Sequence, residues 1–129
     1  MTMQRSIAAA RVGEPQPNAD GTTFFEFRFG ADNPVFAGHF PGRPILPGVF
    51  QLEMVRVAAE VVLQFALAVR EIRKAKFQRP ILPNETVRLV LKLANKTGAI
   101  QAHAHFSVIG QPAGEMILLL WQNQNLKRG

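Results

Sequence analysis

The side chains that could carry chemistry in this sequence are a histidine in a loop rich in glycine and proline and a glutamate that follows it. Cysteine is absent, so thiolate nucleophiles, thiolate metal ligands and disulfides are excluded, and any chemistry must come from histidine, carboxylate or hydroxyl groups. His39 and Glu53 belong to the side-chain types that exchange protons in general acid–base catalysis. Each also has a plainer interpretation, because His39 could bond to nearby backbone and Glu53 could pair with Arg56 or be solvated.

Two further histidines, His103 and His105, alternate along one predicted strand and would share one of its faces. This spacing could bind a metal ion, but no third ligand is obvious from the sequence. We therefore expect no metal site, and acid–base chemistry by histidine and glutamate needs no organic cofactor.

The elements that must position His39 and Glu53 are an irregular loop and a long helix. Glycine and proline recur too often between residues 36 and 48 for regular structure, and from Val49 onward the pattern is helical. Polar residues then fall on one narrow stripe of the helix, at Glu53, Arg56, Glu60 and Gln64. The rest of its surface is apolar, which predicts a helix that is mostly buried.

Strand patterns surround this helix. Alternating or continuous apolar residues predict strands over 6–12, 23–29, 87–93, 100–108 and 116–121, with a weaker candidate at 72–77. Turn residues predict a hairpin loop at 13–21 and turns at Asn95–Gly98 and Gly110–Gly114, and we expect the polar tail from Gln122 to be frayed. Together they predict an α+β fold with five or six mostly antiparallel strands covering one long helix.

Length and charge set the remaining limits. A chain of 129 residues with 47% hydrophobic residues predicts one domain spanning residues 1–129. The net charge of +6 is concentrated between Arg70 and Lys96, which predicts an acidic partner: a nucleic acid, an anionic membrane or an acidic protein. The alternative is a solvated strand face. Polar residues interrupt the segment Val49–Val69, and the first residues carry no secretory signal, so we expect a cytoplasmic protein.

The most informative segment runs from Gly38 to Glu53. It contains Gly-His-Phe-Pro, two further prolines, Pro-Gly-Val and a helical glutamate, at Gly38, His39, Phe40, Pro41, Pro44, Pro47, Gly48, Val49 and Glu53. In this it resembles the 3-hydroxyacyl-(acyl carrier protein) dehydratases of fatty acid synthesis. The block from Lys76 to Pro83 is similar to the strand and turn that follow the helix in the same family.

The resemblance implies a hot-dog fold, in which an antiparallel sheet wraps around one long central helix, and an active site built between two subunits. It implies that His39 of one subunit and Glu53 of the other are catalytic. The backbone N–H of Gly48 would bind the thioester oxygen, and we expect Val49, Phe40, Phe36 and Val57 to contact the substrate.

The implied reaction is removal of water from a 3-hydroxyacyl thioester on acyl carrier protein, giving a trans-2-enoyl thioester. Arg73, Lys74, Lys76 and Arg79 would bind the acidic carrier. A homodimer, or a higher oligomer of dimers, is expected, with neither nucleic acid nor membrane as partner.

The sequence departs from the family at two points. Val57 stands where the family usually has glutamine, and the N-terminal Pro-His-Arg-like segment is missing, which indicates a short, specialised relative serving a secondary fatty acid or polyene pathway. Two other functions stay open on the sequence alone. They are hydrolysis of acyl thioesters and a non-catalytic module that binds acyl chains or nucleic acid.

Overall fold

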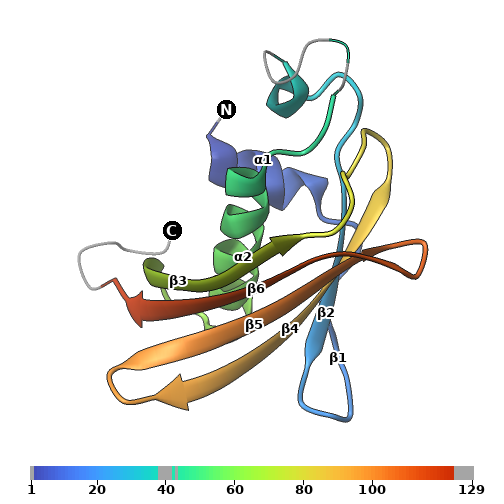
Figure 1. The fold of residues 1–129 in the computed structure, drawn as a ribbon. Coiled ribbons are helices and arrows are strands. Elements are labelled where there is room, and N and C mark those ends of the chain that lie inside the picture. The colour runs from blue at the N-terminus through green and yellow to red at the C-terminus, as the bar shows by residue number, and fades with distance from the viewer. Residues whose placement is uncertain (1, 38–41, 43, 124–129) are drawn as a thin grey trace.

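A computed structural model describes residues 2–37, 42 and 44–123. Its β-strands form one antiparallel sheet in the order β1-β2-β4-β5-β6-β3, and α2 lies against one face of this sheet (Figure 1). The elements are α1 (Met3–Ala10), β1 (Gln16–Pro17), β2 (Thr23–Arg28), the 3₁₀ helix η1 (Pro34–Phe36), α2 (Gly48–Leu63), β3 (Leu67–Phe77), β4 (Thr86–Lys96), β5 (Ala99–Val108) and β6 (Gln111–Gln122). The predicted α+β arrangement is confirmed.

The core lies between α2 and the sheet. Alternate residues of β4, among them Leu89 and Leu91, are at most 2% exposed, as are Met54 and Val55 of α2. Because side chains alternate between the two faces of a strand, every second residue over this part of β4 points toward α2. Because the sheet is apolar mainly on this face, α2 has a fixed position, and its polar stripe is fixed with it.

The first element differs from the prediction. Residues 6–12 were predicted to form a strand, but Met3–Ala10 is the helix α1. Three alanines favour a helix, Thr2 caps it by accepting a hydrogen bond from the Arg5 amide at 3.1 Å, and Ile7 is fully buried. Only the end of the predicted strand is extended, where the Val12 amide donates to the Glu26 carbonyl at 2.7 Å.

One of the two later hairpin turns is tighter than predicted. The turn between β4 and β5 is confirmed, with Gly98 at a positive φ. The turn before β6 was predicted at Gly110–Gly114, but Val108 pairs with Gln111 and the loop is Ile109–Gly110 alone. Both residues have positive φ, as a two-residue hairpin that matches the twist of the strands requires.

Strand β3 forms one edge of the sheet and is longer than the predicted segment 72–77. Its residues from Arg70 to Phe77 are all exposed. Ile72 is the register partner of buried Leu118, so Ile72 points to the same side of the sheet as α2, yet it is 51% exposed. An exposed apolar row beside an unpaired strand edge is the surface against which a second chain would pack.

None of the helices in residues 2–37, 42 and 44–123 is long and apolar enough to cross a bilayer. The single domain over residues 1–129 stays a prediction, and most of the tail predicted to fray lies outside the described residues.

Candidate active site

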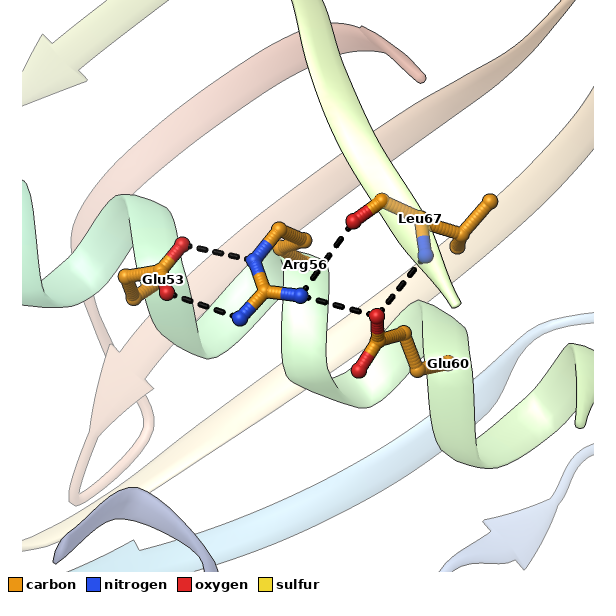
Figure 2. A network of polar contacts seen from close by, with 4 residues as sticks. All are labelled: Glu53, Arg56, Glu60 and Leu67. Carbon is orange, nitrogen blue, oxygen red and sulfur yellow. Dashed lines mark hydrogen bonds and ion pairs between the residues drawn. The ribbon is translucent and has the colours of Figure 1, made fainter. Parts of the chain in front are cut away.

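Glu53 is held by a bidentate ion pair with Arg56, one helical turn later on α2 (Figure 2). Arg56 donates from Nε to Glu53 Oε2 and from Nη2 to Glu53 Oε1, both at 2.8 Å. The Glu53 side chain is 22% exposed, against 13% for Arg56. The carboxylate is therefore partly exposed to solvent, but the arginine fixes its orientation and prevents free rotation on the helix surface.

The same arginine is anchored on its other side by Glu60 and by the start of β3. Nη1 of Arg56 donates to Glu60 Oε2 at 2.8 Å and to the Leu67 carbonyl at 3.3 Å, and the Leu67 amide donates to the same Glu60 oxygen at 2.8 Å. The hydrogen bond to Glu53 is the main reason why the pKa of Arg56 is raised above its ordinary value, and Coulomb attraction to both glutamates adds to it. Arg56 is thus always charged, and the three side chains form one rigid group that we call the Glu53–Arg56–Glu60 triad.

A cavity of about 300 Å³ opens beside the first turn of α2. Gly48, Gln51, Phe77 and Arg79 line it, together with Ile45, Leu46, Pro47, Gln78 and Pro80. Pro47 caps the helix without a side-chain hydrogen bond, and the first amides of a helix have no acceptor within it. The N–H groups at Gly48 therefore lie where an oxygen that gains negative charge could be stabilised. A larger hollow of about 640 Å³, between Glu26 and Gly110, is lined by none of the predicted site residues.

Phe77 and Gln51 shape this cavity, and neither was predicted as a site residue. A Cβ added to Gly48 would lie 2.8 Å from Phe77 Cζ, so only glycine leaves room for the ring above the helix start. Gln51 is 4% exposed, donates to the Leu46 carbonyl at 3.3 Å, and its Oε1 is buried without a hydrogen-bond partner in the part of the chain that the structure describes. A glutamine among apolar helix residues, off the polar stripe, was the sequence signal that could have identified it.

The other predicted substrate contacts are spread over different environments. His39 and Phe40 lie outside the described residues. Phe36 and Val57 are each 8% exposed and belong to the core, whereas Val49 is 60% exposed and does not line the cavity. Of the residues predicted to contact the substrate, the structure places Gly48 in the wall of the cavity. Glu53 does not line it and lies further along α2.

Three of the four basic residues predicted to bind a carrier are paired within the chain. Arg73 bonds to Glu71 at 2.7 Å, Lys74 to Glu115 at 2.8 Å, and Arg79 to Glu85 at 2.9 Å. The pairing also lowers the pKa of Glu85, with the Arg79 hydrogen bond as the largest cause. Among these four residues, only Arg79 lines the cavity, so it is the one best placed to meet a group entering there.

Comparison with known proteins is informative over most of the chain. The model of the ApeI-like family, described as ApeI dehydratase, matches residues 15–115. The chain is 32% identical over 123 residues to the 3-hydroxyacyl-[acyl-carrier-protein] dehydratase FabZ of Ehrlichia chaffeensis, covering 89% of this chain and 83% of that protein. It is 41% identical over 85 residues to FabZ of Desulforamulus reducens, covering 58% and 60% of the two chains.

Among solved structures, the dehydratase heterocomplex ApeI:P from Xenorhabdus doucetiae superposes with a TM-score of 0.74 at 24% identity, covering 87% of this chain and 96% of that chain. At this identity the match speaks for the fold, and it confirms the predicted hot-dog fold.

Proposed function

The chain belongs to the ApeI-like dehydratase family, and we propose on that premise that it removes water from 3-hydroxyacyl thioesters carried by acyl carrier protein. The observation that carries the proposal is the similarity to a 3-hydroxyacyl-(acyl carrier protein) dehydratase over 83% of that protein's length. The half-buried carboxylate of Glu53, at the position implied by the family resemblance, adds support.

The proposed chemistry is an elimination across two neighbouring carbons. His39 takes the proton next to the thioester carbonyl, and the electron pair of that C–H bond forms the new double bond. The bond between carbon 3 and its hydroxyl oxygen breaks, and Glu53 gives that oxygen the proton with which it leaves as water. During the step the thioester oxygen gains negative charge, which the N–H of Gly48 stabilises.

The triad holds the Glu53 carboxyl group in one orientation. Two carboxylates share one guanidinium, which bonds to Glu53 through two nitrogens and to Glu60 through the third. Arg56 and Glu60 are therefore positioning residues. They give Glu53 the support that the family's glutamine would give and that Val57 cannot.

We propose that two copies of the chain form the active site by joining along β3. Ile72 and Phe77 are 51% and 53% exposed on the side of α2, and Val49, which follows Gly48 at the start of that helix, is 60% exposed. Burial of apolar surface contributes about 25 cal/mol per Å², so covering these side chains at an interface would stabilise a dimer. Arg56, which holds Glu53, bonds to the first residue of β3, and Glu53 does not line its own chain's cavity. In a dimer joined along β3, Glu53 would therefore act in the partner's cavity.

The carrier protein is the proposed macromolecular partner, and Arg79 is its first contact. Arg79 combines partial exposure, at 28%, with a place in the cavity wall. The Arg79→Glu variant should raise KM for the carrier-bound substrate with little change in kcat, because long-range attraction mainly sets the rate of encounter. Arg73→Glu is the matched control, since Arg73 is also paired with a glutamate but does not line the cavity. Equal KM values for the two variants would remove Arg79 from the proposal.

The proposed role of Glu53 as the acid can be tested by comparison with a second glutamate, Glu71. Glu53→Gln should abolish formation of the enoyl thioester, read as ultraviolet absorbance, while urea unfolding shows a folded protein. Glu71→Gln is the control, because Glu71 is an exposed glutamate of β3 that pairs with Arg73. Full activity of Glu53→Gln would rule out Glu53 as the acid. Release of free carrier thiol instead of alkene would favour thioester hydrolysis.

The shared site can be tested by mixing two inactive variants. If His39 and Glu53 act from different subunits, a dimer of one His39→Ala chain and one Glu53→Gln chain has one intact site. Random reassociation should then restore roughly a quarter of the wild-type activity. No recovery, with mixed dimers shown by native mass spectrometry, would place both residues in one subunit. A higher oligomer of dimers and a cytoplasmic location stay predictions.

A further inference from the structure

The outer face of the sheet carries a cluster of two histidines and a glutamate, opposite the face that packs on α2. His103 and His105 alternate with Ala102 and Ala104, which are fully buried on the inner face. Glu115 of β6 is the register partner of His105. Cross-strand pairing thus supplies the third polar side chain that the sequence did not reveal, because Glu115 lies on another strand.

The ligand atoms of the three residues converge. Glu115 Oε2 is 2.6 Å from His103 Nε2 and 3.8 Å from His105 Nε2, and the three atoms all lie within 4.8 Å of one another. Ligands of a tetrahedral zinc ion, at about 2.0–2.1 Å from the metal, are about 3.3 Å apart. Movements of less than about 1.5 Å, within reach of the side-chain rotations of half-exposed imidazoles, would bring the set to that spacing.

The surroundings orient the carboxylate. Lys74 Nζ bonds to the other oxygen, Oε1, at 2.8 Å, which leaves Oε2 facing both imidazole rings. Lys76 and Lys92 are register partners of Glu115 and His103 on the same face, and their positive charge limits the affinity for a cation.

We propose that His103, His105 and Glu115 form a binding site for a divalent transition-metal ion of the Zn²⁺ type, with Glu115 bound through Oε2 and water completing the coordination. Imidazole and carboxylate ligands suit Zn²⁺, Cu²⁺ and Ni²⁺, and Lys74 acts as the outer partner that fixes the ligating carboxylate. The site joins β5 to β6 on the face away from the core. It does not depend on the proposed function, and no step of the elimination uses it.

Metal binding here competes with protons and strengthens the fold. Both histidines must be neutral to bind, so metal binding releases any proton that they carry. An ion that binds only the folded chain must raise the unfolding temperature, since β5 and β6 separate on unfolding.

The test is titration of tag-free protein with zinc chloride at pH 7.5, read by isothermal titration calorimetry and by thermal unfolding. The wild type should bind about one ion per chain, and His103→Ala and His105→Ala should each weaken binding by about tenfold or more. Gln101→Ala is the matched control, because Gln101 lies on β5 at the same alternation and is not a proposed ligand. The chain's third histidine, His39, is present in every variant and contributes equally to each titration.

The His103→Ala/His105→Ala variant decides the outcome. Loss of both the zinc binding and the zinc-induced rise in unfolding temperature supports the site. Zinc binding of the same stoichiometry and affinity in this variant, or no zinc binding by the folded wild type, overturns the proposal. Replacing zinc chloride by magnesium chloride should give no binding, because Mg²⁺ prefers oxygen ligands in octahedral geometry.

Discussion

Replacing Arg56 by methionine removes the one cation that two half-buried carboxylates share. The methionine chain fills a similar volume along the helix but leaves Glu53 and Glu60 without the guanidinium that they share. Glu60 keeps the hydrogen bond from the Leu67 amide at 2.8 Å, and its side chain is 6% exposed. The substitution therefore removes a positive counter-charge from a buried carboxylate.

The expected loss of stability follows from that burial. Removing one partner of a buried ion pair costs about 3–5 kcal/mol, and the exposure of Glu53 places Arg56→Met near the lower end, at about 3 kcal/mol. The double variant Arg56→Met/Glu60→Gln should recover about 1–2 kcal/mol, because a neutral amide needs no counter-charge and can still accept from the Leu67 amide.

Urea unfolding of the wild type and both variants measures these differences. The reasoning predicts that the double variant is more stable than the single one, although it has one more substitution. A cost below about 1 kcal/mol for Arg56→Met, or a double variant that is no better, would show that water screens the triad. Arg56 could not then hold Glu53 in place for catalysis.

Three further predictions follow from single contacts. Because the folded-state pKa of Glu115 is lowered from 4.5 to about 2, its ionised form stabilises the fold above pH 4.5, and this contribution is lost as the pH falls toward 2. The unfolding temperatures of wild type and Glu115→Gln should therefore differ at pH 7 and converge near pH 2; a constant gap would contradict the assignment. Gly114→Ala should destabilise the fold by about 1–3 kcal/mol in urea, since its Cβ would lie 2.9 Å from the Lys76 carbonyl oxygen, and an unchanged midpoint would contradict that contact. Gly48→Ala meets only the end of the Phe77 ring, so it should cost less than about 1 kcal/mol but lower kcat/KM, and full activity would show that the ring position is unimportant.

Sequence reasoning succeeded where a pattern is local and long. The buried helix, the alternating strands 87–93 and 100–108 and the Asn95–Gly98 turn depend on periodicity and turn chemistry within a few residues, and all are present. The comparisons confirm the dehydratase family, which the spacing of the motif from Gly38 to Glu53 had indicated. The apolar run 116–121 lies, as predicted, in a strand with neighbours on both sides.

The errors have physical causes outside such windows. Residues 6–10 were assigned to a strand because the run Ile7–Ala10 is apolar. A short alanine-rich segment can form either a helix or a strand. Packing of this segment against α2 selects the helix. The predicted turn at Gly110–Gly114 was too long, because proline and glycine also occur at the start of β6, where Ala113 and Gly114 are buried.

In the candidate site, too, local features could be predicted from the sequence and contacts between distant segments could not. Glu53 could be selected from the motif, and its pairing with Arg56 was the alternative weighed against catalysis. The structure shows that this pairing exists, and that Glu60 and Leu67 extend it. Contacts between α2 and the start of β3, or between β5 and β6, bring together residues that are distant in sequence, so neither the anchoring of Arg56 and Glu60 on Leu67 nor Glu115 beside His103 could be seen in advance.

The most direct test of the central claim is to mix the wild-type protein with 3-hydroxyacyl carrier proteins of several chain lengths and follow each carrier by mass spectrometry. The account predicts that the acyl carrier loses the mass of one water while the thioester stays attached, and that Glu53→Gln leaves the substrate unchanged. Release of the free carrier thiol, or an unchanged substrate at every chain length with folded wild-type protein, would contradict it.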